Sequence, residues 1–577
     1  MTFLRQLVRR PEWPVAAILF AGLLGLSWRR WASFDGDLNR EWTTPARVAA
    51  GERLYKDVAY YYGPLAPYAE AVAFRTFGSR VGTAIGFGIL AAAGTLALIL
   101  GATGDLLRTP GRLGVATVTV GILAFAPENG ALVACYSQAA LLAVGLSWLA
   151  FLLSRRGVAA WAGLAGGLAL LAKIEAAPAL LGPLLLLDCR GRIRFASVAA
   201  GVALAGYGIA IFGIPLVELV SYGPLRHLVM PPEFRELYLR VSGLHPALLA
   251  SGISGAVVGL GLAGGWLLGV GGLLARRGPR AAAGLAFLAA GVFLQRGRAP
   301  EEFLTTAIRG LPLLLLMAFA VATWELLLPG EEARRRDEAR LALATCLVGV
   351  SFAWRTAFWT VPSFPYAPLA ALSSLPAVAW LAGSVVPRGV PAGSRERAAF
   401  LVCLPLIVAP LFFLPRLVAF YRPERTAVLA PRGLWYPPDP QGELFSGVVA
   451  HLARTGVADR SLVVFPEASA VGFLLGVRSP LRIEQILPGH VMPGVDADLV
   501  AQMKATRPER VVRIDRPTSE YGGARLGIDY ATEFMSLIET DYEEEARFEA
   551  ASPGGGTPLR AVVLRLRPSR EPRRRPG

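Results

Sequence analysis

The stretch 155–194, RRGVAAWAGLAGGLALLAKIEAAPALLGPLLLLDCRGRIR, decides the fold class. It contains two apolar runs, 158–172 and 174–187, and arginines stand at both outer ends of the pair. About 20 apolar residues cross the hydrocarbon core of a bilayer, and fewer suffice inside a helix bundle. Arginine is enriched in the cytoplasmic loops of multispanning membrane proteins. The stretch therefore predicts two membrane helices whose connecting turn, around Lys173, lies on the outer side.

The composition of the whole chain extends this pattern. Hydrophobic residues make up 54% of the 577 residues and charged residues only 17%, whereas about a quarter of the residues are charged in an average soluble domain. This composition excludes a water-soluble globule and a disordered chain. The other apolar runs lie at Val15–Trp28 and near 81–100, 113–126, 137–153, 195–215, 247–275, 281–296, 309–328, 340–353, 366–386 and 398–415. Together with the first pair they predict a mainly α-helical membrane bundle of about thirteen spans.

The placement of arginine predicts how these spans are oriented. The formal net charge is +16, and only three of the 58 basic residues are lysines. Arginine clusters fall in every second loop, at 108–112, 155–156, 190–194, 276–280, 334–336 and 388–397. The positive-inside rule then predicts a cytoplasmic N-terminus, and an odd number of spans places the C-terminal tail outside. No segment interleaves basic and aromatic residues as a nucleic-acid interface does, so the charge indicates the lipid bilayer as partner and not nucleic acid.

Three segments are too long to be simple turns on the outer side. Residues 29–80 follow the first span, 216–246 follow the seventh, and a tail begins at 421. We therefore expect a transmembrane domain at 1–420, with 29–80 as its first outside loop.

The tail differs from the rest of the chain in composition. It contains more polar and turn residues and a helical pattern near 442–454. Strand-like runs follow at 462–465, 511–514 and 562–564. We expect a small soluble α/β domain at 421–567 and a disordered end at 568–577.

The first outside loop carries acidic residues directly after a membrane helix. Asp35 and Asp37 are followed by Arg40 and Glu41, and a helix would place Asp37, Arg40 and Glu41 on one face. A carboxylate at the membrane rim can accept a proton from a hydroxyl group or hold a divalent cation. A solvated loop with an aspartate helix cap explains the same letters. The residue types alone leave both interpretations open.

Two further segments of this loop carry a resemblance. Residues 51–58 read GERLYKDV, residues 60–78 read YYYGPLAPYAEAVAFRTFG, and both follow the acidic segment around Asp35 and Asp37. Together they resemble the first periplasmic loop of family 39 glycosyltransferases and their bacterial relatives, which share the GT-C fold. The resemblance implies that an aspartate of this loop is the catalytic carboxylate. By position it falls on Asp37, with Asp35 as the second choice.

The resemblance also implies a donor, a sugar carried on a polyprenyl phosphate. Its phosphate would need cations near the membrane surface, and we expect Lys173, Arg355, Arg40 and Lys56 to bind it. Supporting roles are expected for Glu41, Tyr55, Tyr61, Glu175 and Tyr366. Simpler explanations are a Lys173–Glu175 ion pair and, for Arg355, an aromatic belt at the interface. Residues 222–240 could cover a substrate or anchor the chain at the interface.

These expectations combine into one function. The chain is expected to be a glycosyltransferase of the bacterial inner membrane, transferring a hexosyl or pentosyl group on the periplasmic face with inversion. The acceptor would be a glycan, a lipid or a protein. No cofactor is required by these residues, although the loop carboxylates could hold a divalent cation. The alternatives are a transporter or flippase of lipid-linked sugars, and an inactive relative that acts as a binding module.

Overall fold

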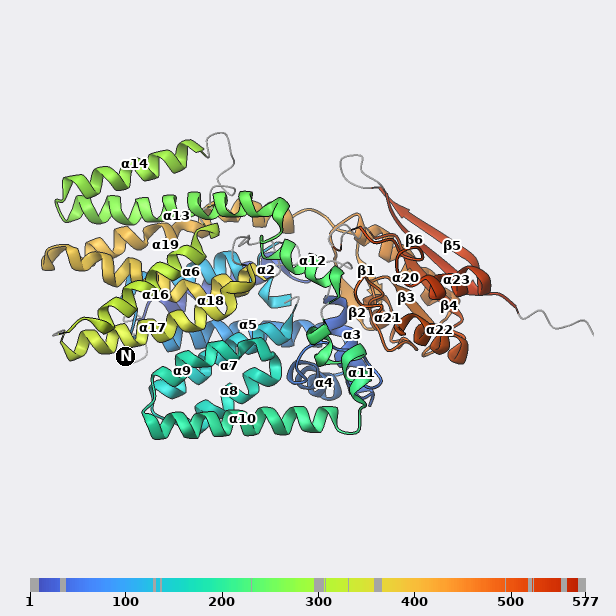
Figure 1. Ribbon diagram of the computed structural model, residues 1–577. Coiled ribbons are helices and arrows are strands. Elements are labelled where there is room, and N and C mark those ends of the chain that lie inside the picture. The colour runs from blue at the N-terminus through green and yellow to red at the C-terminus, as the bar shows by residue number, and fades with distance from the viewer. Residues whose placement is uncertain are drawn as a thin grey trace, which may run out of the picture.

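The computed structural model describes residues 10–31, 38–127, 131–134, 137–229, 231–294, 306, 308–329, 332–356, 366–492, 494–516, 521, 523–551 and 558–568. Asp35, Asp37 and residues 569–577 of the predicted disordered end lie outside these ranges. The described chain consists of a helical bundle, a C-terminal α/β part, and a layer of short helices between them (Figure 1). The prediction of a mainly helical chain with a small C-terminal α/β part is confirmed.

The bundle is built from helices that alternate with short connections. They are α2 (Glu12–Ser27), α5 (Val81–Thr103), α6 (Thr109–Val118), α7 (Gln138–Arg155), α8 (Ala159–Ala172), α9 (Leu181–Leu185), α10 (Cys189–Ile211), α13 (Pro246–Leu274), α14 (Gly278–Leu294), α16 (Leu311–Leu327), α17 (Ala333–Ala353), α18 (Ala367–Trp380) and α19 (Arg395–Tyr421). Among the described residues, 6 helices are long and apolar enough to cross a membrane, and shorter apolar helices of 10–17 residues accompany them. The total of about thirteen spans stays a prediction.

The second apolar run of the opening stretch differs from the expected continuous helix. Helix α8 ends at Ala172, and a 3₁₀ helix at Ile174–Leu180 precedes the short α9. Pro178 has no N–H to donate to a preceding turn, which disfavours a regular α-helix here. The segment packs closely on α17, because a Cβ atom on Gly182 would lie 2.5 Å from the carbonyl oxygen of Ala344. This irregular turn puts Lys173, whose side chain is buried, at a break between helices of the bundle rather than inside one of them.

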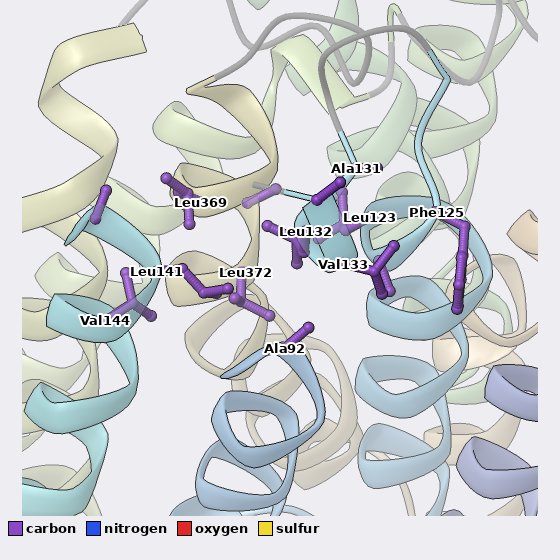
Figure 2. Packing of buried hydrophobic residues seen from close by; sticks show 14 of the residues in the cluster. Ala92, Leu123, Phe125, Ala131, Leu132, Val133, Leu141, Val144, Leu369 and Leu372 are labelled. Carbon is purple, nitrogen blue, oxygen red and sulfur yellow. The ribbon is translucent and has the colours of Figure 1, made fainter. Parts of the chain in front are cut away.

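The core of the bundle is filled by small and branched side chains from several helices. Figure 2 shows Leu132 of a short 3₁₀ segment on the side of Leu372 in α18 and Leu141 in α7, and Val133 of the same segment on the other side, toward Phe125. All five side chains are nearly fully buried. Such packing fixes the positions of the helix ends that carry the polar residues described below.

The layer between the two parts contains α3 (Leu38–Ala49), α4 (Leu65–Phe77), α11 (Leu216–Tyr222) and α12 (Pro232–Val241) (Figure 1). Helix α3 is buried along nearly its whole length. The reason is that the C-terminal part covers it: the rings of Trp42 and Trp435 lie 4.9 Å apart, and those of Trp42 and Phe473 5.7 Å apart.

The C-terminal part is a four-stranded sheet with helices packed on it. Its elements are β1 (Val428–Ala430), β2 (Gly433–Trp435), α20 (Gln441–Thr455), β3 (Leu462–Phe465), α21 (Ala470–Leu475), α22 (Val495–Thr506), β4 (Arg510–Ile514), α23 (Thr532–Asp541), β5 (Tyr542–Ala550) and β6 (Leu559–Leu566). The strand order is β3-β4-β6-β5, and only the β3–β4 pair is parallel. The helix near 442–454 and the three predicted strands are confirmed, whereas β5 and the β1–β2 hairpin were not predicted.

A buried arginine joins this part to α3. Arg47 donates from Nε to Glu52 at 2.6 Å and from Nη1 to Glu484 at 2.5 Å. It also donates to the carbonyl oxygens of Leu481 at 2.7 Å and Asp57 at 3.0 Å. A buried ion pair needs such complete hydrogen bonding to offset its desolvation. The network therefore fixes the C-terminal part against the outside loop.

Candidate functional site

Two cations and one carboxylate meet where the bundle reaches the outer layer. The side chain of Lys173, at the end of α8, is only 4% exposed, and its Nζ lies 3.5 Å from the carboxylate of Glu175. Arg355, which follows α17, donates from Nη1 to the same carboxylate at 2.6 Å. Two positive charges thus share one negative charge. The group keeps a net positive charge in a place from which water is largely excluded, where electrostatic interactions are strong.

Aromatic rings surround this pair of cations. The Nζ of Lys173 lies 4.3 Å from the ring centroid of Tyr62 and 5.5 Å from that of Tyr366. The guanidinium carbon of Arg355 lies 4.2 Å from the centroid of Tyr366. Cation–π contacts stabilise a desolvated cation without neutralising it. The cluster of Lys173, Glu175, Arg355, Tyr62 and Tyr366, here called the lysine cluster, is therefore suited to receive an anion.

The position of Tyr62 is fixed from three sides. The hydroxyl of Tyr55 donates to the carbonyl oxygen of Tyr62 at 2.7 Å. The ring of His227 stacks on that of Tyr62 with centroids 5.8 Å apart. Gly63 lets the chain approach the last turn of α8 so closely that a Cβ atom would overlap the carbonyl oxygen of Leu171. The same turn carries Lys173, so the contact at Gly63 sets the distance between the lysine and the tyrosine ring.

For the sugar transfer that the loop resemblance implies, we expect Gly63→Ala to impair transfer more than it lowers stability. The added methyl group must push the 60–63 segment off the end of α8, because both partners are backbone atoms that cannot rotate away. Initial rates of transfer and thermal denaturation of the purified variant measure the two effects. Gly86→Ala is the matched control, since a Cβ atom at Gly86 meets nothing within 4 Å. Full transfer activity in Gly63→Ala would contradict the role given to this contact.

Arg40 approaches the same tyrosine from α3. Its guanidinium carbon lies 5.1 Å from the centroid of Tyr62 and 5.8 Å from that of Tyr60. Its Nη2 lies 3.4 Å from the carboxylate of Glu41, which also accepts from the backbone N–H of Gln138 at 3.2 Å. Helix α3 begins at Leu38, the residue after Asp37. The acidic pair of the loop therefore connects directly to the helix that carries Arg40 to the lysine cluster.

The structure brings together most of the site residues expected from the sequence. Lys173, Glu175, Arg355 and Tyr366 contact one another, and Arg40 with Glu41 joins them through Tyr62. Asp35 and Asp37 lie outside the described residues. Lys56 has an exposed side chain in the turn after Tyr55 and forms no ion pair within the described chain. Tyr55 supports the site through the backbone of Tyr62 rather than through contact with a cation.

Tyr61 does not belong to the lysine cluster. Its ring faces the guanidinium of Arg226 at 4.6 Å and the ring of His490 at 5.2 Å. Side chains of an extended segment point alternately to opposite sides, so Tyr60 and Tyr62 face one way and Tyr61 the other. This alternation in the run of three tyrosines is the sequence signal that could have selected Tyr62. Nothing comparable in the sequence marks His227.

Two other ionisable groups of the outer layer have shifted pKa values. Burial raises the pKa of the Glu70 carboxyl well above its ordinary value, and the negative charge of Glu41 adds to this effect. Burial lowers the pKa of His227. Both shifts favour the uncharged form of the group. Among the described residues no group of three or more His, Cys, Asp or Glu side chains could hold a metal ion, and a divalent cation at Asp35 and Asp37 stays a prediction.

Comparisons with known proteins give only distant likenesses. A search of protein-family models finds no match for this chain, and a search of curated proteins finds none. The crystal structure of an oligosaccharyltransferase from Archaeoglobus fulgidus in complex with Zn and sulfate is 14% identical, with a TM-score of 0.49 over 94% of this chain and 72% of that chain. Apo ArnT from Cupriavidus metallidurans is 14% identical, with a TM-score of 0.38 over 98% of both chains. ArnT bound to undecaprenyl phosphate is 13% identical, with a TM-score of 0.38 over 96% of this chain and 97% of that chain. At these values no residue role is transferred from them.

Proposed function

We propose that the chain is a membrane glycosyltransferase of the GT-C type that uses a sugar linked to polyprenyl phosphate. The observation that carries the proposal is the lysine cluster, in which the buried Lys173 and Arg355 share the single carboxylate of Glu175. It lies at the end of apolar helices, where the phosphate of a membrane-embedded lipid would be found. The resemblance of the first outside loop to family 39 glycosyltransferases supports the same assignment.

The chemistry proposed for the site is a single displacement. A hydroxyl or amine of the acceptor attacks the anomeric carbon of the sugar while Asp37, or Asp35 in its place, takes the proton. The bond between the anomeric carbon and the phosphate oxygen breaks, and the polyprenyl phosphate leaves with the bonding electron pair. Lys173 and Arg355 stabilise the charge that develops on this oxygen. One displacement inverts the anomeric centre and needs no second carboxylate as nucleophile.

The proposed topology places this reaction on the periplasmic face of a bacterial inner membrane. The N-terminus and the arginine-rich loops would be cytoplasmic, as the positive-inside rule requires. Residues 1–420 would form the transmembrane domain, and 421–567 a periplasmic domain over the outside loop. The sugar would be a hexose or a pentose, and the acceptor a glycan, a lipid or a protein of the cell envelope.

Transfer in a reconstituted system tests the proposal. Vesicles that contain the purified chain are supplied with a polyprenyl phosphate carrying a labelled sugar and with an envelope extract. We expect label to move to the acceptor with inversion of the anomeric configuration. Movement of the intact lipid-linked sugar across the bilayer without a product would instead indicate a flippase. Absence of both, with binding of envelope glycans, would indicate an inactive binding module.

A further inference from the structure

Among the described residues, a second cation of the outer layer has no negative partner. Arg226, in the 3₁₀ helix Pro224–Val229, is 1% exposed. Its Nη1 donates to the carbonyl oxygen of Ser221 at 2.9 Å, whereas its buried Nε and Nη2 have no hydrogen-bond partner in the part of the chain that the structure describes. No carboxylate of the described chain lies within ion-pair distance of it. An uncompensated buried charge is destabilising, so such an arginine indicates a site for an anion.

The Nε and Nη2 atoms of the Arg226 guanidinium have the geometry that binds an anion. Nε and Nη2 form one edge of the planar group, and this edge binds the two oxygens of a carboxylate or phosphate side by side. Rings flank the guanidinium carbon, that of Tyr61 at 4.6 Å and that of Phe234 at 5.2 Å. His490 packs on both rings, with centroid distances of 5.2 Å and 5.1 Å. Burial, followed by the charge of Arg226, lowers the pKa of His490, so this histidine is neutral and adds no competing charge.

Arg226 and the lysine cluster lie on opposite sides of one extended segment. Tyr62 faces Lys173, and the adjacent Tyr61 faces Arg226. Arg226 is therefore on the side of the C-terminal part, from which His490 comes, and the lysine cluster is on the side of the bundle. A donor with a single phosphate occupies one of these sites. The anion at the other site must come from a different molecule.

Helix α12 covers both sites with one face. Phe234 lies over Arg226, and Tyr238, four residues later, lies over Arg355 with 5.3 Å between the guanidinium carbon and the ring centroid. In Figure 1 α12 runs between the bundle and the C-terminal part. Aromatic rings stabilise both cations while no anion is present.

We propose that Arg226 anchors a negatively charged group of the acceptor, a phosphate monoester or a carboxylate, beneath α12. This inference rests on the proposed function, because that function assigns the lysine cluster to the donor phosphate. The acceptor group would bind the Nε/Nη2 edge, with Phe234 packed against the guanidinium group. Bound there, the acceptor reaches the donor across the segment Tyr60–Tyr62.

Binding of inorganic phosphate and of acetate to the full chain tests this assignment. The purified protein is first saturated with polyprenyl phosphate to fill the lysine cluster. Its melting temperature is then followed against each anion at constant ionic strength. We expect a saturable rise with phosphate, acetate or both, which identifies the class of acceptor group. In Arg226→Gln the anion should bind about tenfold or more weakly, as loss of a charged bidentate contact implies.

Two further variants separate anion binding by Arg226 from the other possible outcomes. Arg240→Gln is the matched control, because Arg240 lies on the covering helix α12 and forms an ion pair with Glu236 at 2.7 Å, and its anion response should equal that of the wild type. Arg226→Lys keeps the charge without the Nε/Nη2 edge and should also bind the anion more weakly. This variant gives the test a result even where Arg226→Gln does not fold.

An anion response equal to that of the wild type in both Arg226 variants overturns the inference. Weakened polyprenyl phosphate binding in Arg226→Lys overturns it too, since Arg226 then serves the donor. Failure of the proposed function would appear separately, as polyprenyl phosphate binding that is unchanged in Lys173→Gln.

Discussion

Asp37→Asn is expected to lower sugar transfer by about 10²–10⁴-fold, the usual contribution of a positioned general base. Asparagine has nearly the same shape as aspartate but cannot accept the proton that the acceptor hydroxyl must lose. Binding of polyprenyl phosphate should be unchanged, because the donor phosphate is assigned to Lys173 and Arg355. The substitution should therefore lower the turnover rate and leave the affinity for the donor unchanged.

Asp35→Asn is the matched partner of this variant. The two aspartates are separated by one glycine, and only one of them is needed as the base. Transfer from labelled polyprenyl-linked sugar is measured for both variants in membranes with equal amounts of protein. The variant with the larger loss identifies the base. Normal transfer in both single variants and in the double variant would reject catalysis by this loop.

Lys173→Gln and Arg355→Gln are expected to weaken donor binding and to slow transfer. Each removes one charge-assisted hydrogen bond to the phosphate, worth about 1.5–3 kcal/mol, or about 10- to 100-fold in the dissociation constant. Because the charge on the leaving oxygen grows during the reaction, the rate of the bound complex should fall further, by about 10²–10³-fold. Each variant also leaves the carboxylate of Glu175 with a single cationic partner, which adds repulsion against the phosphate.

Lys504→Gln is the control for these two variants. Lys504 is an exposed lysine at the end of α22, far along the chain from the bundle. Its removal changes the net charge by the same amount as that of Lys173. Binding of polyprenyl phosphate and single-turnover transfer separate affinity from rate. Donor affinities equal to that of Lys504→Gln would contradict the assignment of the lysine cluster.

The bundle could be predicted from the sequence because its signals are local. Apolar runs and the arginines between them require no knowledge of which helix packs against which. The strand-like runs of the tail were readable for the same reason, as in Leu462–Phe465. Strand β5 was not, since YEEEARFEA is highly charged and Glu544 interrupts the apolar face formed by Tyr542, Ala546, Phe548 and Ala550. Charged residues are typical of an edge strand, which protects the sheet from further pairing.

The candidate site could be predicted only in part. Lys173 and Arg355 stood out because charged residues at the ends of apolar segments are costly and rare. Lys173 and Arg355 both contact Glu175 because of the way α8 packs near α17. No local sequence pattern encodes this packing. The roles of Tyr62 and Arg226 depend on contacts between residues far apart in the sequence, such as Tyr61 with His490. The burial of α3 beneath the C-terminal part was missed for the same reason.

The most direct test of the central claim is an experimental structure of the full chain with polyprenyl phosphate bound. The account predicts that phosphate oxygens lie within hydrogen-bond distance of Lys173 Nζ and the Arg355 guanidinium, beside Tyr62, with the polyprenyl chain along the bundle. It also predicts that the carboxylate of Asp37 or Asp35 faces the same opening. A phosphate bound at the arginine-rich ends of the helices, or an acidic pair on the opposite side of the membrane from Lys173, would contradict it.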